Sequence, residues 1–270
     1  MLPLVGCLAV LFAPAFAVDA PEGVVAYRFN DGSIGQPIEA PSNLGSDPDV
    51  VASVVTSDGG EAMTVRSRAG QGRAVDFPAV ADSAAGRRAA LAISDRDTGD
   101  GDALSPGRRS FALLADFKLD AGNTQADGGN NLVQRGLAKS SDQFKVQVDL
   151  AGAQAWPECA VGQTRDGEWQ VAVATSPRPV QPGQWYRIRC RRTPDALALT
   201  VLVIADDGTR SRFSHIRVSG IPLFSLRWPA DSTVPMSIGG KLRPSGQFYP
   251  QGDQFSGVVD NVSLRIRDTT

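Results

Sequence analysis

The stretch that decides the fold is Pro182-Gly183-Gln184-Trp185-Tyr186-Arg187-Ile188-Arg189-Cys190. Its Pro-Gly pair is typical of a turn, and the residues that follow alternate between apolar and charged side chains. In an extended strand every second residue from Tyr186 to Cys190 shares one face, whereas Trp185 and the arginines as far as Arg191 share the other. This pattern predicts a central strand of a β-sandwich.

Similar alternation recurs along the chain between Gly, Pro and Asp turns. The clearest case is Gln143–Leu150, in which apolar and polar residues alternate strictly. Residues 211–234 show no such pattern and contain two prolines, so we expect them to be irregular. No long segment has the apolar period of an α-helix, which predicts an all-β protein of two antiparallel sheets. Further strands are expected at Val25–Asn30, Val50–Val55, Met63–Ser67, Ala74–Phe77, Ala89–Ser94, Ser110–Leu119, Leu132–Gly136, Glu158–Val161, Gln170–Thr175, Ala196–Ile204, Pro235–Gly240 and Phe255–Arg267.

The charge balance excludes one class of partner. The chain has 270 residues, with 27 basic and 29 acidic side chains and a formal charge of −2. Bulk charge therefore does not favour nucleic acid or an anionic membrane as a partner. His215 is the single histidine, which excludes zinc sites built from several histidines.

The first residues predict export. Leu2–Ala17 is a nearly unbroken apolar run that ends in a small-x-small cleavage pattern at Ala17. At about 16 residues, this run is short for a membrane span and fits a secretory signal peptide. We predict a signal peptide over 1–17, one domain over 18–270 without a membrane span, and a secreted protein.

An alternative for the same segment is a lipid anchor. Leu4-Val5-Gly6-Cys7 matches a bacterial lipobox, in which Cys7 would be acylated. The apolar run continues for ten residues past Cys7, where a lipoprotein turns polar. Both interpretations predict export.

Two cysteines remain after removal of the signal peptide. In an exported protein, Cys159 and Cys190 should pair, because an oxidising compartment leaves no reason for both thiols to stay free. We expect them on neighbouring core strands.

Several short elements, taken in order, resemble those of laminin G-like domains. They are Tyr27–Asp31, Asp102–Gly107, Asn131–Gly136, Pro182–Cys190, Pro235–Gly240 and Phe255–Val262. The resemblance spans nearly the whole mature chain and implies a concanavalin A-like jelly roll of two antiparallel sheets. It also implies an extracellular module that binds glycans or proteins, in some cases with calcium.

Two groups of carboxylates are candidate calcium ligands. The stretch Asp95–Asp102 is acidic, but Gly99 and Pro106 occupy ligand positions of an EF-hand loop, so a solvated turn is the alternative. In the closing strand, Asp260 falls at the alternating positions of apolar residues and is expected on the apolar face. The resemblance places the first and last strands side by side, which would bring Asp31 near Asp260 with calcium between them. The alternative is that each carboxylate accepts hydrogen bonds from its local backbone.

Three functions remain open. A non-catalytic binding module would use exposed aromatic residues as sugar platforms, with Trp156, Trp169, Trp228 and Tyr249 as candidates besides Trp185. A polysaccharide-active enzyme needs paired carboxylates at strand spacing or a histidine-based set, and neither pattern occurs. A structural adhesion domain without a small ligand has no distinguishing sequence feature. We therefore expect a binding protein without hydrolase or lyase activity.

Overall fold

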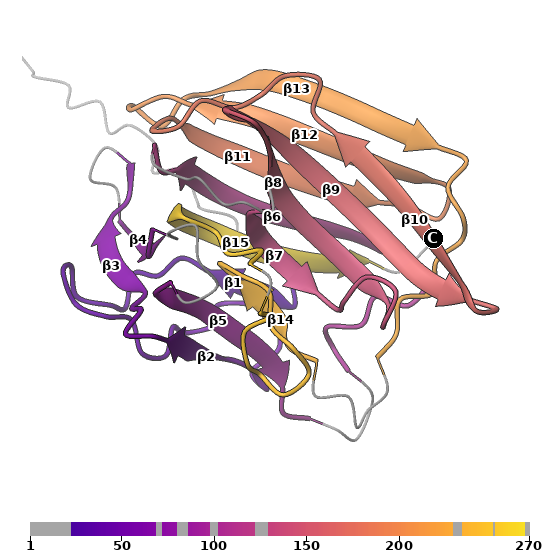
Figure 1. Ribbon diagram of the computed structural model, residues 1–270, viewed down its shortest axis with the longest axis horizontal. Helices are drawn as coiled ribbons and strands as arrows, with labels where there is room; N and C mark the ends of the chain where they lie inside the picture. The colour runs from indigo at the N-terminus through magenta and orange to yellow at the C-terminus, as the bar shows by residue number, and fades with distance from the viewer. Residues whose placement is uncertain are drawn as a thin grey trace, which may run out of the picture.

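The protein is a sandwich of two antiparallel β-sheets. The computed structural model describes residues 23–68, 72–79, 86–97, 102–121, 129–228, 234–250 and 252–267, and these residues form no α-helix. The predicted signal peptide and the alternative anchor at Cys7 lie outside them. Figure 1 shows strands β8 to β10 in one layer and β11 to β13 in the other.

Each sheet is built from strands that are distant in the sequence. The eight-stranded sheet has the order β13-β12-β11-β6-β15-β4-β3, with β1 paired to β15. The seven-stranded sheet has the order β10-β9-β8-β7-β14-β5-β2. The strands of the first sheet are β1 Val25–Tyr27, β3 Met63–Arg66, β4 Arg73–Phe77, β6 Ser110–Leu119, β11 Trp185–Arg192, β12 Ala196–Ile204, β13 Arg210–Ser219 and β15 Gly257–Arg267. The strands of the second are β2 Val50–Ser57, β5 Arg88–Asp95, β7 Asn131–Arg135, β8 Gln143–Ala151, β9 Gln154–Arg165, β10 Glu168–Thr175 and β14 Met236–Ile238.

The central strand predicted from its sequence is confirmed. β11 lies between β12 and β6, and its inward residues Tyr186, Ile188 and Cys190 are buried in the core between the sheets. Burial of these side chains against the opposite sheet explains why the alternation is so regular here. Within the described residues, no helix is long and apolar enough to cross a membrane.

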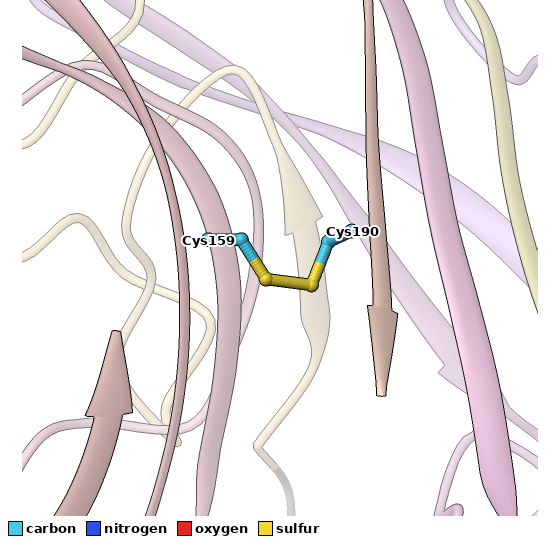
Figure 2. Close-up of a disulfide and its surroundings, with 2 residues drawn as sticks. All are labelled: Cys159 and Cys190. Carbon is cyan, nitrogen blue, oxygen red and sulfur yellow. A yellow bond between two sulfur atoms is a disulfide. The ribbon is translucent and has the colours of Figure 1, made fainter. Parts of the chain in front are cut away.

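A disulfide joins the two layers. Cys159 of β9 and Cys190 of β11 are bonded, with their Cα atoms 5.6 Å apart. Figure 2 shows the bond crossing from one strand to the other. The predicted pairing is correct, but the two strands belong to opposite sheets instead of being neighbours in one sheet. A core disulfide fits an extracellular protein.

One strand was missed by the sequence analysis. Residues 210–219 form β13, at the edge of the eight-stranded sheet, where irregular structure was expected. The register with β12 shifts between Val201 and Leu202, so Phe213 is an extra residue opposite them. This bulge puts the inward residues Phe213 and Ile216 out of phase, which hides the alternation.

A second bulge corrects the expected face of Asp260. The ladder between β15 and β6 pairs Asp260 with Asp116 and Ser263 with Leu114, so β15 has one extra residue at this point. Asn261 takes a positive φ of 50° there. The inward side therefore changes from Val259 before the bulge to Val262 after it. The unbroken pattern predicted that Asp260 shares the apolar face with Val262. This prediction is wrong: Asp260 points outward from the sandwich, whereas Val262 points inward.

Removing the disulfide should lower stability. The bond closes a loop between residues separated by 31 positions, and we expect the Cys159→Ala/Cys190→Ala variant to lose about 3–4 kcal/mol of unfolding free energy. Urea denaturation of the oxidised protein and the variant measures the difference. Reduced wild-type protein should unfold at the same urea concentration as the variant. Equal stability of all three forms would contradict the prediction.

Candidate functional site

Arginines line the outward face of the eight-stranded sheet. On β11 they alternate with the buried residues of the core, and the register aligns Arg191 with Ala112 of β6, which in turn pairs with Arg265 of β15. The small side chain of Ala112 leaves space between the two guanidinium groups. We call the following outward side chains the arginine face: Arg187, Arg189, Arg191, Arg210, Arg217, Arg265 and Arg267.

Two adjoining clefts open on this face. The larger has a volume of about 520 Å³, and the smaller of about 340 Å³. Arg189 of the smaller cleft pairs in register with Leu114 of the larger one, so the clefts lie on neighbouring strands. The larger cleft is lined by Arg28, Arg68, Arg187, Arg210, Arg265, Asp260 and Asn261, among others. The smaller is lined by Arg189, Arg191, Arg217, Thr193, Ala196, Ala198, Thr200 and His215.

A buried carboxylate organises the larger cleft. Asp116 of β6 is fully buried. Its Oδ2 accepts hydrogen bonds from Arg187 Nη2 at 2.7 Å, Arg68 Nη1 at 2.9 Å and Asn261 Nδ2 at 3.0 Å. Arg187 also bonds the second oxygen through Nε, which makes the pair bidentate. Two guanidinium groups are thus fixed at the base of the cleft.

Asp260 lies next to this cluster with a perturbed pKa. It is 4% exposed, and its oxygens accept hydrogen bonds from Ser67 Oγ at 2.6 Å and from the backbone N–H of Asn261 at 2.7 Å. Burial raises its pKa to about 6, and the negative charge of Asp116 acts in the same direction. The carboxylate therefore carries a proton in part of the population near neutral pH.

Four arginines of this face lie close enough to repel one another. Partial burial lowers the pKa of Arg189, and the neighbouring charges of Arg191, Arg265 and Arg267 lower it further. Guanidinium groups stay protonated in proteins, so these four positive charges persist close together. Among the described residues, none of the four has a carboxylate within ion-pair distance.

The two aspartates proposed as calcium ligands have different hydrogen-bond partners. β1 lies beside β15 as expected. However, Asp31 follows the end of β1 and accepts a hydrogen bond from Ser42 N–H at 2.7 Å, whereas Asp260 bonds Ser67 and Asn261. Besides these hydrogen bonds, the positive charge of Arg68 favours the ionised form of Asp260. In the described part of the chain, no group of three His, Cys, Asp or Glu side chains is arranged to hold a metal ion.

The acidic stretch Asp95–Asp102 is described at its two ends. Asp95 accepts hydrogen bonds from the N–H groups of Asp97 and Ala103. Asp102 forms an ion pair with the buried guanidinium of Arg135. These carboxylates bond local backbone and a core arginine, as in a structural turn; residues 98–101 lie outside the described ranges.

The aromatic candidates fall into two groups. Trp228 is 5% exposed and packs in the core, with the Arg135 guanidinium 4.3 Å from its ring centroid, so it offers no surface platform. Trp185 is also buried. Tyr249 is half-buried, with Lys241 Nζ 4.1 Å from its ring centroid.

Two tryptophans lie on the other sheet. Trp156 and Trp169 are half-buried and point outward from the seven-stranded sheet. The ring of Trp169 covers Gly162 of the paired strand, where an added Cβ would lie 2.3 Å from the ring. Neither residue contributes to the arginine face.

The single histidine is part of the smaller cleft. His215 is exposed, and its Nδ1 lies 2.9 Å from Thr200 Oγ1. Within the described residues it has no hydrogen bond or ion pair to a carboxylate. The charged residues that line the smaller cleft with it are Arg189, Arg191 and Arg217.

Sequence reasoning found only part of this site. The arginines of β11 were visible as one side of an alternating strand. The contributions of β13 and β15 were missed, because their outward phase depends on bulges. Asp116 was also missed, since an acidic residue at an outward position of a predicted strand is expected to be solvated.

Comparison with known proteins shows the fold alone. No model of a protein family matches the chain, and no curated protein does. The chain is similar to the binding domain of Paraclostridial Mosquitocidal Protein 1, with 9% identity, a TM-score of 0.52, and coverage of 92% of this chain and 50% of that chain. It is also similar to the enzymatically active domain of tailspike protein 2 of bacteriophage CBA120, with 16% identity, a TM-score of 0.50, and coverage of 90% and 35%.

The chain spans half or less of the length of these two structures. Domains LG4-5 of the mouse laminin α1 chain match at 13% identity over 62% of this chain and 41% of that chain, but a TM-score of 0.32 is too low to carry an argument. The predicted sandwich of two antiparallel sheets is confirmed.

Removing the charge of Asp116 should destabilise the protein strongly. In Asp116→Asn, the guanidinium groups of Arg68 and Arg187 lose their anionic partner in a desolvated position, and we expect a loss of about 3–5 kcal/mol. Asp120→Asn, at an adjoining position beyond the end of the same strand, is the control and should cost less than about 1 kcal/mol. Denaturant unfolding of both variants at neutral pH checks the prediction, and equal losses would contradict it.

Asp260 should make stability fall as pH rises. Because its folded-state pKa is raised from 3.8 to about 6, the folded protein binds more protons than the unfolded chain between these values. This contribution is fully present below pH 4 and is lost as pH rises through 6, with a total of up to about 3 kcal/mol.

The comparison with Asp260→Asn isolates this effect, because other titrating groups are common to both proteins. The unfolding free energy of wild type minus that of the variant should decrease between pH 4 and pH 7. A difference that stays constant over this range would contradict the assignment.

Proposed function

We propose that the protein is an extracellular binding module that recognises an anionic glycan through its arginine face. The observation that carries this proposal is the pair of adjoining clefts in which Arg189, Arg191 and Arg265 have no carboxylate of the described residues within ion-pair distance. Arginine binds carboxylate and sulfate groups through two parallel hydrogen bonds, which favours it over lysine for this class of ligand.

The arrangement fits an extended ligand better than a small ion. Arg191 and Arg265 are separated by one strand, and adjacent strands lie about 4.8 Å apart. Charged groups are therefore spaced across several strands, over two clefts. A polymer that carries an anionic group on successive units can contact several of them at once. The predicted signal peptide and the core disulfide support an extracellular setting.

The function is tested by binding to acidic polysaccharides. Polygalacturonate and heparin should bind the purified protein, and raising the salt concentration should weaken both, because exposed charges are screened. The triple variant Arg189→Ser/Arg191→Ser/Arg265→Ser should bind at least tenfold more weakly, which is on the order of 1.4 kcal/mol. Isothermal titration calorimetry measures both effects.

The control has the same change in net charge. Arg96→Ser/Arg165→Ser/Arg243→Ser removes three exposed arginines from the seven-stranded sheet and its loops, and should bind like wild type. Equal losses in both triple variants would mean that only net charge matters. Tighter binding of single-stranded DNA than of either polysaccharide would replace the glycan proposal.

A further inference from the structure

A row of side chains on the arginine face alternates between arginine and alanine from strand to strand. Strand pairing puts one residue from each of five adjacent strands in line, perpendicular to the strands (Figure 1). All five residues are half-buried or exposed, so a ligand can reach them. In order, they are Arg265 of β15, Ala112 of β6, Arg191 of β11, Ala198 of β12 and Arg217 of β13, and we call them the alternating row.

The arginines of the alternating row are evenly spaced. Each is separated from the next by one strand that carries an alanine. Because adjacent strands lie about 4.8 Å apart, the Cα atoms of successive arginines lie about 10 Å apart. The alanine methyl groups leave the surface of the sheet low between the guanidinium groups. The row therefore presents positive charge at every second strand, with a small apolar side chain at the strand between.

The alternating row connects the two clefts. Arg265 lines the larger cleft, whereas Arg191, Ala198 and Arg217 line the smaller one. Ala112 lies on the strand between Arg265 and Arg191 and carries only a methyl group, so it forms no wall between the clefts. An extended molecule can therefore follow the row from one cleft into the other.

The three positive charges are accessible to an anionic ligand. Arg191 and Arg265 have no carboxylate of the described residues within ion-pair distance. Arg217 forms an ion pair with Asp195 at 3.7 Å, and both side chains are more than half exposed. Exposed ion pairs contribute little to stability. An anionic group of a ligand can therefore replace Asp195 at small cost.

Uncharged polar side chains flank the alternating row. On one side, Thr200 and His215 pair in register. On the other side, Thr193 follows the last residue of β11. All three residues line the smaller cleft. Their hydroxyl and imidazole groups donate and accept hydrogen bonds, which suits the hydroxyl groups of a sugar.

A polymer that matches this row carries an anionic group on every second unit. In an extended polysaccharide, one sugar unit has nearly the length of the strand separation of about 4.8 Å. Acidic units then lie over the arginines, and neutral units lie over the alanines. We propose, as an extension that rests on the anionic-glycan function proposed above, that the alternating row binds an acidic polysaccharide whose repeat is one charged and one neutral sugar. The chain of sugars runs across the strands.

Two oligosaccharides of equal charge test the spacing. A hyaluronan hexasaccharide carries three carboxylates on alternating units, whereas trigalacturonate carries three on successive units. The first can contact all three arginines, but the second can contact at most two. Calorimetry should show about tenfold tighter binding of the hexasaccharide, because each linked contact adds to the affinity. Equal affinities would mean that only charge matters and would overturn the proposed repeat.

Substitution of the end arginine tests the length of the site. Arg217→Ser should bind the hyaluronan hexasaccharide only as tightly as the tetrasaccharide, since two arginines remain. The tetrasaccharide should keep its affinity, because Arg191 and Arg265 still hold it. Arg212→Ser is the matched control: Arg212 is exposed on the same strand and lines neither cleft. This control should bind both ligands like wild type, and equal losses in the two variants would contradict the proposal.

Substitution of an alanine tests the places of the neutral sugars without a change in charge. Ala198→Gln fills the space between Arg191 and Arg217, and should weaken hexasaccharide binding about tenfold, or ~1.4 kcal/mol. Ala205→Gln, at an exposed position just after the same strand, should bind like wild type. Both variants should keep the wild-type melting temperature. Unchanged affinity in Ala198→Gln would contradict the placement of a sugar over the alanine.

Failure of this proposal is distinguishable from failure of the anionic-glycan function. Absence of binding to hyaluronan, polygalacturonate and heparin would overturn both. Binding of polygalacturonate or heparin without binding of hyaluronan would overturn only the alternating repeat. Hyaluronan binding that does not depend on Arg217 would likewise leave the general function intact and remove the row as its site.

Discussion

The complete removal of the Asp116 carboxylate from water is the constraint on which the outward face of the eight-stranded sheet depends. A buried charge costs several kcal/mol unless it is paired and hydrogen-bonded. Here the partners come from β11, from Asn261 in the bulge of β15 and from the segment that follows β3. The same carboxylate therefore ties together three parts of the chain and neutralises one guanidinium charge, leaving most of the neighbouring arginines uncompensated.

Local sequence patterns predicted the two sheets, but not which side chains of β13 and β15 point outward. β8 and β11 alternate without interruption, so their inward and outward residues were read correctly. In β13 and β15 a single extra residue breaks the alternation, and its position depends on the partner strand. The arginine face combines strands that are distant in the sequence and are brought together only by strand pairing. For this reason the sequence pattern revealed only the part on β11. The burial of Asp116 had no sequence signal, because an acidic residue at an outward strand position is usually solvated.

The near-zero net charge conceals a division of charge between the two faces. Arginines gather on the eight-stranded sheet, whereas Asp149, Glu158 and Asp253 lie near one another on the seven-stranded sheet. Composition alone argued against a partner bound through bulk charge, yet one face is locally positive over two clefts. For a sandwich, the relevant quantity is the charge of each face. The disulfide between β9 and β11 holds these contrasting faces back to back.

The extra residue at Asn261 reverses the alternation of inward and outward side chains along β15. Every side chain beyond it is displayed on the opposite side from the one that the preceding residues would dictate. Loss of that one residue would direct Arg265 and Arg267 into the core and Leu264 into solvent. During divergence, this strand can therefore change length only together with the order of its apolar and charged residues. An alignment of distant relatives should show the two changes inherited as a unit.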